Sequence, residues 1–261
     1  MELFSLKNKN ALITGGTHGL GMAMAEALAT AGAKLLITGT TPQKMEDALA
    51  YYHSKGYDAK GYLFDVTDEN EAAKYVNLIT EEAGGIHILV NNAGIIKRES
   101  ALSMAVSDFR RVIDVDLVGP FVMSQLVVKQ MIDRNEGKII NICSMMSELG
   151  RNSVSAYAAA KGGLKMLTRN LATEWAKHNI QVNGICPGYF ATSQTEPIRV
   201  DGNPFNEFII SRTPAGRWGN PEDLGGAAVF LASAASNFVN GQIIYVDGGI
   251  LATIGKPSNE D

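Results

Sequence analysis

Residues 11–21 read ALITGGTHGLG, and this stretch decides the fold. Ala11 to Thr14 form a short aliphatic run that predicts a buried strand, and a helical pattern of apolar residues begins at Leu20. The glycines between strand and helix let the backbone turn sharply and approach a pyrophosphate, whose charge the helix N-terminus stabilises. A glycine-rich turn that binds nothing is the alternative, but the position directly after the first strand favours a nucleotide loop. The candidate cofactor contacts in this loop are Gly15, Thr17, His18, Gly19 and Leu20.

The same succession of strand and helix repeats along the chain. Predicted strands cover residues 11–14, 34–38, 61–66, 86–91, 138–142, 181–185 and 242–246. Predicted helices cover residues 20–31, 42–53, 69–83, 107–134, 155–177 and 221–232. The strands lack polar–apolar alternation, which is typical of strands buried on both faces, and the helices between them imply parallel crossovers. We therefore expect an α/β fold, a single Rossmann-type doubly wound parallel sheet of about seven strands with helices on both faces.

No linker or repeat interrupts this pattern, so residues 1–261 are predicted to form a single dinucleotide-binding and catalytic domain. Residues 189–218 depart from the pattern, because they are rich in Pro, Gly, Asn and Thr and contain only a short helical stretch near residues 206–210. An insertion this long in a compact domain is usually functional, and we expect it to act as a substrate lid. The polar tail, residues 255–261, is expected to be disordered.

Composition and charge exclude several classes of protein. The formal net charge is −4, and no basic block is present, which argues against nucleic acid or an anionic membrane as a partner. The apolar runs fall far short of the ~20 residues that span a bilayer, and residues 1–10 lack the pattern of a secretory signal. The two cysteines, Cys143 and Cys186, have no metal-ligand spacing, so we expect no metal site and a reducing, cytoplasmic location.

Two further strand ends complete the predicted nucleotide site. Residues 91–94, NNAG, follow the fourth strand and leave room for a ribose, although Asn and Gly are also ordinary turn residues; Asn91, Ala93 and Gly94 are the candidates. Asp65 and Val66 end the third strand, where the carboxylate either accepts a hydrogen bond from adenine or caps the next helix. After the second strand no carboxylate stands ready for a ribose 2′-hydroxyl. His18, Thr40 and Thr41 offer donors to a 2′-phosphate, so NADP(H) is favoured while NAD(H) stays possible.

Three side chains at the other end of the predicted site suggest redox chemistry. Ser144 follows the fifth strand, and Tyr157 and Lys161 lie four residues apart on one face of the next helix. A phenol with an ordinary pKa of about 10 is a poor acid–base group at neutral pH, but a nearby ammonium and an oxidised nicotinamide favour the phenolate. Tyr157 is then able to take a proton from an alcohol as hydride leaves, while Ser144 holds the substrate oxygen. A helical Tyr with a Lys one turn later is commonplace, and the triple is much more specific.

These motifs together resemble the short-chain dehydrogenase/reductase family over nearly the whole chain. The resemblance is carried by residues 14–21, residues 91–94, Ser144, residues 157–161 (YAAAK) and residues 187–192 (PGYFAT). It implies a Rossmann fold, a nicotinamide cofactor and a homotetramer, with Pro187, Gly188 and Thr192 closing over the nicotinamide and Lys161 binding ribose hydroxyls. It also implies a catalytic role at the position of the family's usual Asn, where this sequence has Asp116. Either Asp116 supports the proton relay to Lys161 in place of Asn, or the enzyme is slower.

The substrate is predicted from a subfamily resemblance and from charge. Residues 141–151, 178–184 and 212–219 resemble gluconate 5-dehydrogenases and, less closely, 2-deoxygluconate 3-dehydrogenases. The resemblance implies NADP(H)-dependent interconversion of D-gluconate and 5-dehydro-D-gluconate. A sugar acid carries a carboxylate and requires a cation in the pocket. Arg98, after the NNAG loop, is the first candidate for substrate binding, and Arg151 and Glu148 on the Ser144 loop rank lower. The alternative is that Arg98 belongs to a solvated loop and binds no substrate. A 3-oxoacyl thioester reductase and a nucleotide-binding regulator without turnover are the remaining alternatives.

Overall fold

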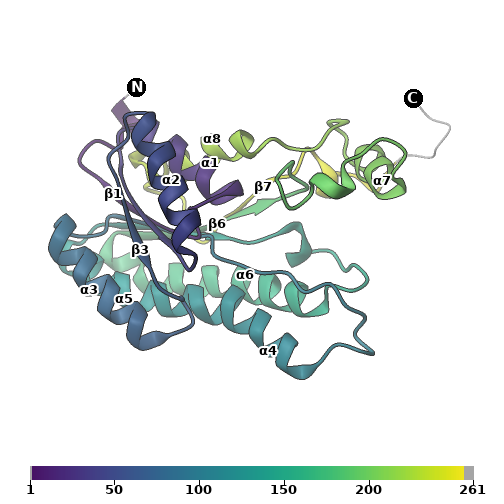
Figure 1. The fold of residues 1–261 in the computed structure, drawn as a ribbon. Helices are drawn as coiled ribbons and strands as arrows, with labels where there is room; N and C mark the ends of the chain where they lie inside the picture. Colours follow the sequence, from purple (N-terminus) through teal and green to yellow (C-terminus); the bar gives the residue numbers. More distant parts are fainter. Residues whose placement is uncertain (1, 256–261) are drawn as a thin grey trace.

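Seven parallel strands form one sheet at the centre of the computed structural model, which describes residues 2–255 (Figure 1). The strand order is β3-β2-β1-β4-β5-β6-β7. The strands are β1 (Asn10–Thr14), β2 (Lys34–Gly39), β3 (Ala59–Leu63), β4 (Ile88–Asn91), β5 (Gly137–Ile142), β6 (Ile180–Pro187) and β7 (Ile243–Val246). The order reverses between β1 and β4, so the predicted doubly wound fold is confirmed. Beyond Gly255, the predicted disordered tail lies outside the described residues.

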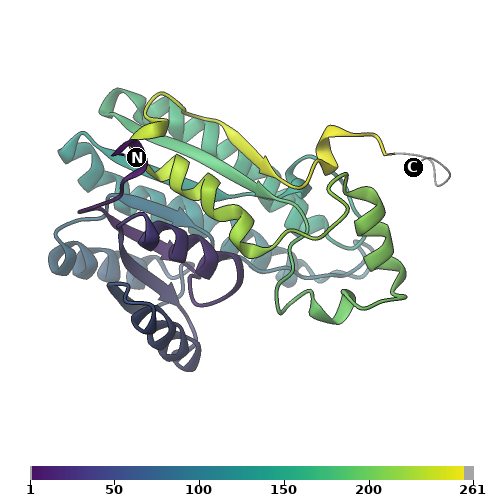
Figure 2. The same ribbon diagram turned by 90° about the horizontal axis from the view of Figure 1, so that it is seen from above.

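Helices cover both faces of the sheet (Figure 1). One side carries α1 (Gly19–Thr30), α2 (Pro42–Ser54) and α8 (Gly225–Ala232). The opposite side carries α3 (Glu69–Ala83), α4 (Val106–Ile113), α5 (Gly119–Arg134) and α6 (Ser155–Trp175). Helix α7 (Pro204–Arg212) belongs to the segment between β6 and α8 and lies at one end of the molecule, near the described C-terminus (Figure 2). No helix within residues 2–255 has the length and apolarity that a bilayer span requires.

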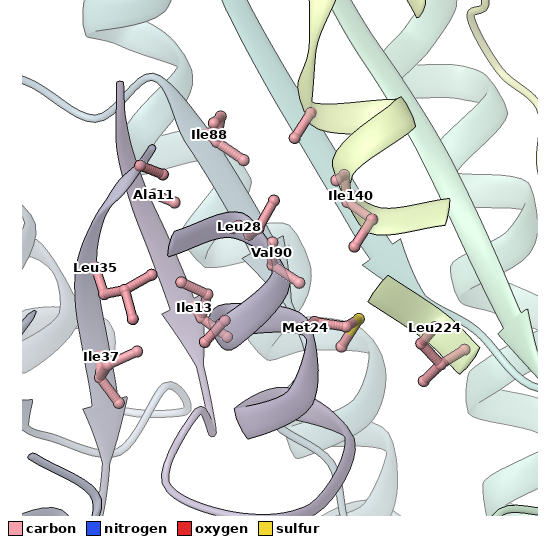
Figure 3. Packing of buried hydrophobic residues seen from close by; sticks show 14 of the residues in the cluster. Ala11, Ile13, Met24, Leu28, Leu35, Ile37, Ile88, Val90, Ile140 and Leu224 are labelled. Carbon is pink, nitrogen blue, oxygen red and sulfur yellow. The ribbon is translucent and has the colours of Figure 1, made fainter. Parts of the chain in front are cut away.

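Two apolar layers hold the helices to the sheet. Ala11 and Ile13 of β1 point toward α1, where they pack with Met24 and Leu28 (Figure 3). Leu12, between them in the sequence, is equally buried but belongs to the cluster on the opposite face. Alternate residues of a strand point to opposite faces, so a strand without polar residues fills both layers. This arrangement leaves the loops at the carboxyl ends of the strands as the place for a ligand.

Most predicted bounds differ from the observed ones by a few residues, and two of the differences have a clear physical cause. Strand β3 ends at Leu63 rather than residue 66, because the carboxylate of Asp65 accepts the N–H of Thr67 at 2.9 Å and turns the chain. The predicted helix 107–134 is interrupted by a π-helical turn, η2 (Asp114–Val118). Pro120 has no N–H to continue the α-helical ladder, and the N–H of Gly119 instead bonds the carbonyl of Asp114, five residues back.

Candidate active site

A cavity of about 700 Å³ opens at the carboxyl ends of β1, β4, β5 and β6, and we call it the central cavity. Most of the residues predicted from the sequence line it, although they come from widely separated parts of the chain. These are Gly15, His18, Gly19, Leu20, Ala93, Gly94, Arg98, Asp116, Ser144, Tyr157, Lys161, Pro187, Gly188 and Thr192. The predicted nucleotide loop and the predicted catalytic residues Ser144, Tyr157 and Lys161 therefore line the same cavity.

The glycine-rich loop has the shape that a pyrophosphate requires. Gly15 and Gly19 have φ angles of 65° and 57°, a left-handed conformation that side chains disfavour. A Cβ on Gly21 would lie 2.4 Å from the carbonyl oxygen of Gly15. The N-cap of α1, His18, makes no side-chain cap bond, so the first N–H groups of this 12-residue helix are available to an anion. This cradle fits the diphosphate of a dinucleotide cofactor.

The loop after β4 is joined to the loop after β1 by side-chain hydrogen bonds. The hydroxyl of Thr14 accepts the N–H groups of Asn92 and Ala93, both at 3.0 Å. The Asn92 amide donates to the carbonyls of Thr14 at 3.0 Å and Gly15 at 2.9 Å. The structure thus places Asn92 at the cavity wall, although the sequence prediction named Asn91.

Asn91 has a different position, inside the protein. Its side-chain amide donates to Ser124 Oγ at 3.0 Å and to Asn141 Oδ1 at 2.8 Å, and the residue is 2% exposed. Strand alternation was the missed signal: Asn91 shares a strand face with Leu89, which packs in the apolar layer on the α5 side.

Ser144 is held at the end of β5 by the short helix that it caps. Its Oγ accepts the N–H of Met146 at 3.1 Å, at the start of η3 (Met145–Ser147). The hydroxyl of Ser147 in turn donates to the carbonyl of Lys161 on α6 at 2.9 Å. The loop bearing Ser144 is therefore connected directly to the helix bearing Tyr157 and Lys161.

Lys161 lies at the centre of the predicted catalytic residues. Its Nζ donates to the carbonyl of Ile142 at 2.9 Å, lies 3.3 Å from Asp116 Oδ2, and is 5.6 Å from the centroid of the Tyr157 ring. Asp116 is fully buried, and its Oδ1 accepts the N–H of Ile95 at 2.8 Å. The π turn of η2 places Asp116 here, and such turns are frequent at functional sites.

The buried pair keeps Lys161 charged. Burial alone would lower the pKa of Lys161, but the Asp116 carboxylate and then the Tyr157 phenol raise it above the ordinary lysine value. Burial raises the pKa of Asp116, and the charge of Lys161 acts in the opposite direction. Asp116 Oδ2 has no hydrogen-bond partner within residues 2–255, although it lies at ion-pair distance from the ammonium. The Tyr157 hydroxyl is likewise without a hydrogen-bond partner in this part of the chain.

The region beyond the glycine loop is rich in donors and contains one cation that the sequence prediction missed. Thr17 is buried with its hydroxyl 3.1 Å from His18 Nδ1, and Thr40 is exposed at the end of β2. Burial lowers the pKa of His18, and the charge of Lys44 lowers it further. Lys44 lies in the first turn of α2, and its signal was the helix start at Pro42.

Asp65 and Val66 do not line the central cavity. The Asp65 carboxylate accepts the hydroxyl of Thr67 at 2.7 Å and pairs with Arg111 at 3.0 Å, and Val66 is buried. The cap of α3 is Asp68, whose carboxylate accepts two N–H groups of the first turn at 3.0 Å. Asp65 therefore does not cap α3, and its contact with adenine stays a prediction.

Of the three charged candidates for substrate binding, two line the central cavity and one does not. Arg98 and Arg151 both line the central cavity. Within residues 2–255, neither arginine forms an ion pair with a carboxylate, whereas the neighbouring Lys97 pairs with Asp108 at 3.0 Å. Glu148 bonds Lys165 and Tyr245 instead of lining the cavity. No group of His, Cys, Asp and Glu side chains in the described part of the chain is arranged to hold a metal ion.

Comparison with known proteins agrees with this geometry. A family model described as enoyl-(acyl carrier protein) reductase matches residues 15–251. Over 100% of its length the chain is 65% identical to the 2-dehydro-3-deoxy-D-gluconate 5-dehydrogenase of Formosa agariphila, covering 99% of that protein. The chain belongs to the short-chain dehydrogenase/reductase family. As a member of this family it is an oxidoreductase.

Two other members of the family match with similar coverage. The 5-keto-D-gluconate 5-reductase of Escherichia coli strain K12 is 46% identical over 97% of this chain and 99% of that protein. The crystal structure of a gluconate 5-dehydrogenase from Burkholderia cenocepacia J2315, in complex with NADP and tartrate, is 42% identical. It superimposes with a TM-score of 0.92 over 97% of this chain and 99% of that chain. The predicted family and its subgroup of sugar-acid dehydrogenases are thus confirmed.

Proposed function

We propose that this chain is an NADP(H)-dependent oxidoreductase that interconverts D-gluconate and 5-dehydro-D-gluconate by hydride transfer. The observation that carries the proposal is that the ring centroid of Tyr157 lies 5.6 Å from the Lys161 ammonium, in the same cavity as Ser144 and the glycine-rich loop. Relatives named for both directions of this reaction support it: 5-keto-D-gluconate 5-reductase and gluconate 5-dehydrogenase.

NADP(H) is the proposed cofactor. Gly15, Gly19 and the first turn of α1 would hold its diphosphate, and the Lys161 side chain its ribose hydroxyls. No carboxylate stands at residues 39–41 to hold a 2′-hydroxyl, whereas His18, Lys44 and two threonines, Thr40 and Thr41, offer donors to a 2′-phosphate. The related Burkholderia structure is an NADP complex. Contacts of Thr17, Leu20, Asp65, Val66, Asn91, Ala93, Gly94, Pro187, Gly188 and Thr192 with the cofactor stay part of this proposal.

The chain's own groups would perform the proton transfer. When bound, the nicotinamide supplies the hydride acceptor or donor. The Tyr157 oxygen accepts the proton of the substrate hydroxyl in the oxidation and returns it to the carbonyl oxygen in the reduction. Ser144 orients that oxygen by a hydrogen bond. Lys161, kept charged by Asp116, stabilises the Tyr157 phenolate, which bears the opposite charge.

Arg98 is proposed to bind the substrate carboxylate. It lines the central cavity, and no carboxylate of the described residues neutralises it, because Glu99 and Asp108 lie with Lys97 instead. A guanidinium grips a carboxylate through two parallel hydrogen bonds, which favours Arg for this task. We further propose that the chain works as one domain in which residues 189–218 form the substrate lid; Tyr189 and Thr192 of this segment line the cavity.

A second candidate substrate is 2-dehydro-3-deoxy-D-gluconate, because the Formosa agariphila relative named for it is 65% identical to this chain. Initial rates with gluconate, 5-dehydrogluconate and 2-dehydro-3-deoxygluconate, each with both nicotinamide cofactors, test the proposal. We expect turnover at carbon 5 of one of these six-carbon sugar acids, with a preference for NADP(H). Absence of turnover on all three acids would refute the proposed function, and turnover of only the deoxy acid would select the second candidate.

We also propose a cytoplasmic homotetramer. The two free thiols, Cys143 and Cys186, are both buried and support a reducing compartment. Exposed apolar side chains along α4 and α5, including Val106 and Phe121, support contacts between subunits, as does the open edge of β7. Light scattering after gel filtration tests the subunit number, and a monomer mass would contradict this part of the proposal.

A further inference from the structure

Arg151 connects the loop that carries Ser144 to the segment proposed as the lid. The residue lies between η3 and α6 and lines the central cavity. Its Cζ lies 4.2 Å from the ring centroid of Phe205 on α7, and its Nη1 donates to the hydroxyl of Tyr189 at 3.2 Å. A guanidinium that stacks on a ring and donates to a neighbouring hydroxyl has a defined orientation although the residue is exposed.

The surface under this guanidinium is itself rigidly packed. The Tyr189 ring meets Phe205 edge-on at 5.8 Å and Trp218 edge-on at 5.6 Å. The Trp218 indole N–H donates to the side-chain oxygen of the buried Asn206 at 2.7 Å. We call Tyr189, Phe205 and Trp218 the aromatic platform. It orients Arg151 before any ligand arrives, which reduces the entropy cost of binding one.

Most of the hydrogen-bonding capacity of Arg151 is unused. A guanidinium has five N–H donors, and within residues 2–255 only one hydrogen bond of this side chain is found, to Tyr189. Two other arginines are neutralised by carboxylates, Arg111 by Asp65 at 3.0 Å and Arg217 by Asp223 at 2.7 Å. An oriented guanidinium without a carboxylate partner, on the wall of a cavity, suits a planar anion such as a carboxylate.

The loops of the two cavity arginines are joined to each other. The N–H of Glu99, next to Arg98, donates to the carbonyl of Ser153, two residues after Arg151, at 2.9 Å. Both guanidinium groups therefore come from one joined pair of loops on the wall of the central cavity.

We infer that Arg151, oriented by the aromatic platform, is a specificity-determining residue that binds the carboxylate of the sugar acid together with Arg98. This inference rests on the proposed function, because it assumes an anionic substrate in the central cavity. Because the guanidinium stacks on Phe205 of α7, the same contact would hold residues 189–218 against the Ser144 loop when the acid is bound.

The test compares four variants on a charged and an uncharged substrate. Arg151→Met removes the charge and keeps most of the apolar stem, Arg151→Lys keeps the charge and loses the fork, and Phe205→Leu removes the stacking surface. Arg169→Met is the matched control, because Arg169 is exposed on α6 and does not line the central cavity. Steady-state rates are measured with 5-dehydro-D-gluconate and with its neutral carboxamide, and NADPH binding is measured by fluorescence titration.

We expect Arg151→Met to raise KM for the acid at least tenfold, with kcat within about threefold and NADPH affinity unchanged, because a hydrogen bond to a charged group is lost. Arg151→Lys and Phe205→Leu raise KM for the acid by less, and the effects of Arg151→Met and Phe205→Leu do not add. With the carboxamide all variants resemble the parent enzyme. An unchanged KM in Arg151→Met, or equal losses for acid and amide, would overturn the inference.

A binding measurement separates this inference from the proposed reaction. Tartrate, a hydroxy acid that serves as a carboxylate probe, is titrated by calorimetry into the enzyme–NADP⁺ complex. We expect binding to the parent and to Arg169→Met, and at least tenfold weaker binding to Arg151→Met. If the parent turns over none of the three sugar acids named above, the proposed function fails, and the tartrate result still decides the role of Arg151. No binding to the parent, or equal binding to all three proteins, would count against it.

Discussion

The ammonium of Lys161 lies between a neutral acceptor and an anion, with the Ile142 carbonyl at 2.9 Å and Asp116 Oδ2 at 3.3 Å. A buried lysine without such partners tends to lose its proton, because burial disfavours the charged form. Here Asp116 raises the pKa of Lys161 above the ordinary lysine value, which favours the ammonium beside the Tyr157 ring. At the residue scale, the proposed chemistry therefore depends on Asp116 keeping Lys161 protonated.

The first prediction at this scale concerns the Tyr157 oxygen. Tyr157→Phe removes the only atom of this side chain that can exchange a proton, and the ring position next to Lys161 is kept. We expect turnover to fall by about three orders of magnitude or more, in line with loss of a general acid–base group. NADPH binding, followed by fluorescence, is expected to stay within about threefold of the parent. A variant with near-native turnover would refute the assigned role.

The second prediction concerns the anion beside Lys161. In Asp116→Asn the amide oxygen can still accept the N–H of Ile95, but the ammonium loses its counter-charge. Since Asp116 raises the pKa of Lys161, its removal lowers that pKa, and Lys161 loses its proton at a lower pH. We expect roughly tenfold lower kcat near neutral pH and an alkaline limb of the pH–rate profile shifted to lower pH.

Asp114→Asn is the control for this change. Asp114 lies in the same π turn and undergoes the same loss of charge, but its side chain is exposed and does not line the central cavity. Its pH–rate profile is expected to match that of the parent. If Asp116→Asn and Asp114→Asn have the same alkaline limb, then Asp116 does not set the charge state of Lys161.

At the scale of elements, the contact between the β1–α1 loop and the β4 loop forms the cofactor end of the cavity. Gly21 lies where a Cβ would meet the Gly15 carbonyl and the Asn92 amide nitrogen, both at 2.4 Å. Gly21→Ala must therefore displace backbone, and we expect NADPH affinity to fall at least tenfold with a stability loss of about 1–3 kcal/mol. Gly226→Ala on α8 is the control, because a Cβ there meets nothing within 4 Å.

The measurements for this pair are NADPH titration and urea unfolding. Gly226→Ala is expected to bind NADPH normally and to be as stable as the parent or slightly more stable, because Ala is a better helix former than Gly. If Gly21→Ala binds NADPH as tightly as Gly226→Ala does, the close packing of the two loops does not shape the cofactor site.

Elements with strong local signals could be predicted, and those set by neighbours could not. Helix α3 was predicted as residues 69–83 and has those bounds, because Asp68 caps its first turn and Gly84 ends it in the left-handed conformation. The π turn at Asp114–Val118 was missed, because residues 107–134 keep a helical apolar pattern on both sides of it. That turn positions Asp116 beside Lys161, so the missed element belongs to the proposed active site.

Across the whole molecule, the sequence was better at predicting which residues line the cavity than at predicting the long-range contacts that orient them. Ser144 follows the end of β5, and Tyr157 and Lys161 lie in the first two turns of the next helix, α6, so all three line one cavity. The stacking of Arg151 on Phe205 spans 54 residues of sequence and has no local signal. Lys44 was missed although it had a local signal, because Pro42 marks the start of its helix, α2.

The last prediction concerns the stability of the whole fold and depends on Lys138, at the start of β5. This residue is 8% exposed, and its ammonium donates to Asn237 at 2.9 Å and Ser236 at 3.2 Å. Burial lowers the pKa of Lys138 to about 8. An unfolded chain would keep this proton up to its ordinary pKa of about 10.4.

The sign of the effect follows from proton counting. Between pH ~8 and ~10.4 the unfolded chain binds a proton that the folded chain has lost, so this group makes the fold more stable as pH rises, by up to about 3 kcal/mol. Lys138→Met removes that gain. We expect its free energy of unfolding in urea, relative to the parent, to fall as pH rises from 7 to 10. Lys129→Met, at an exposed position of α5, should show no such trend. A constant difference between Lys138→Met and the parent across this range would mean that the buried ammonium does not titrate early.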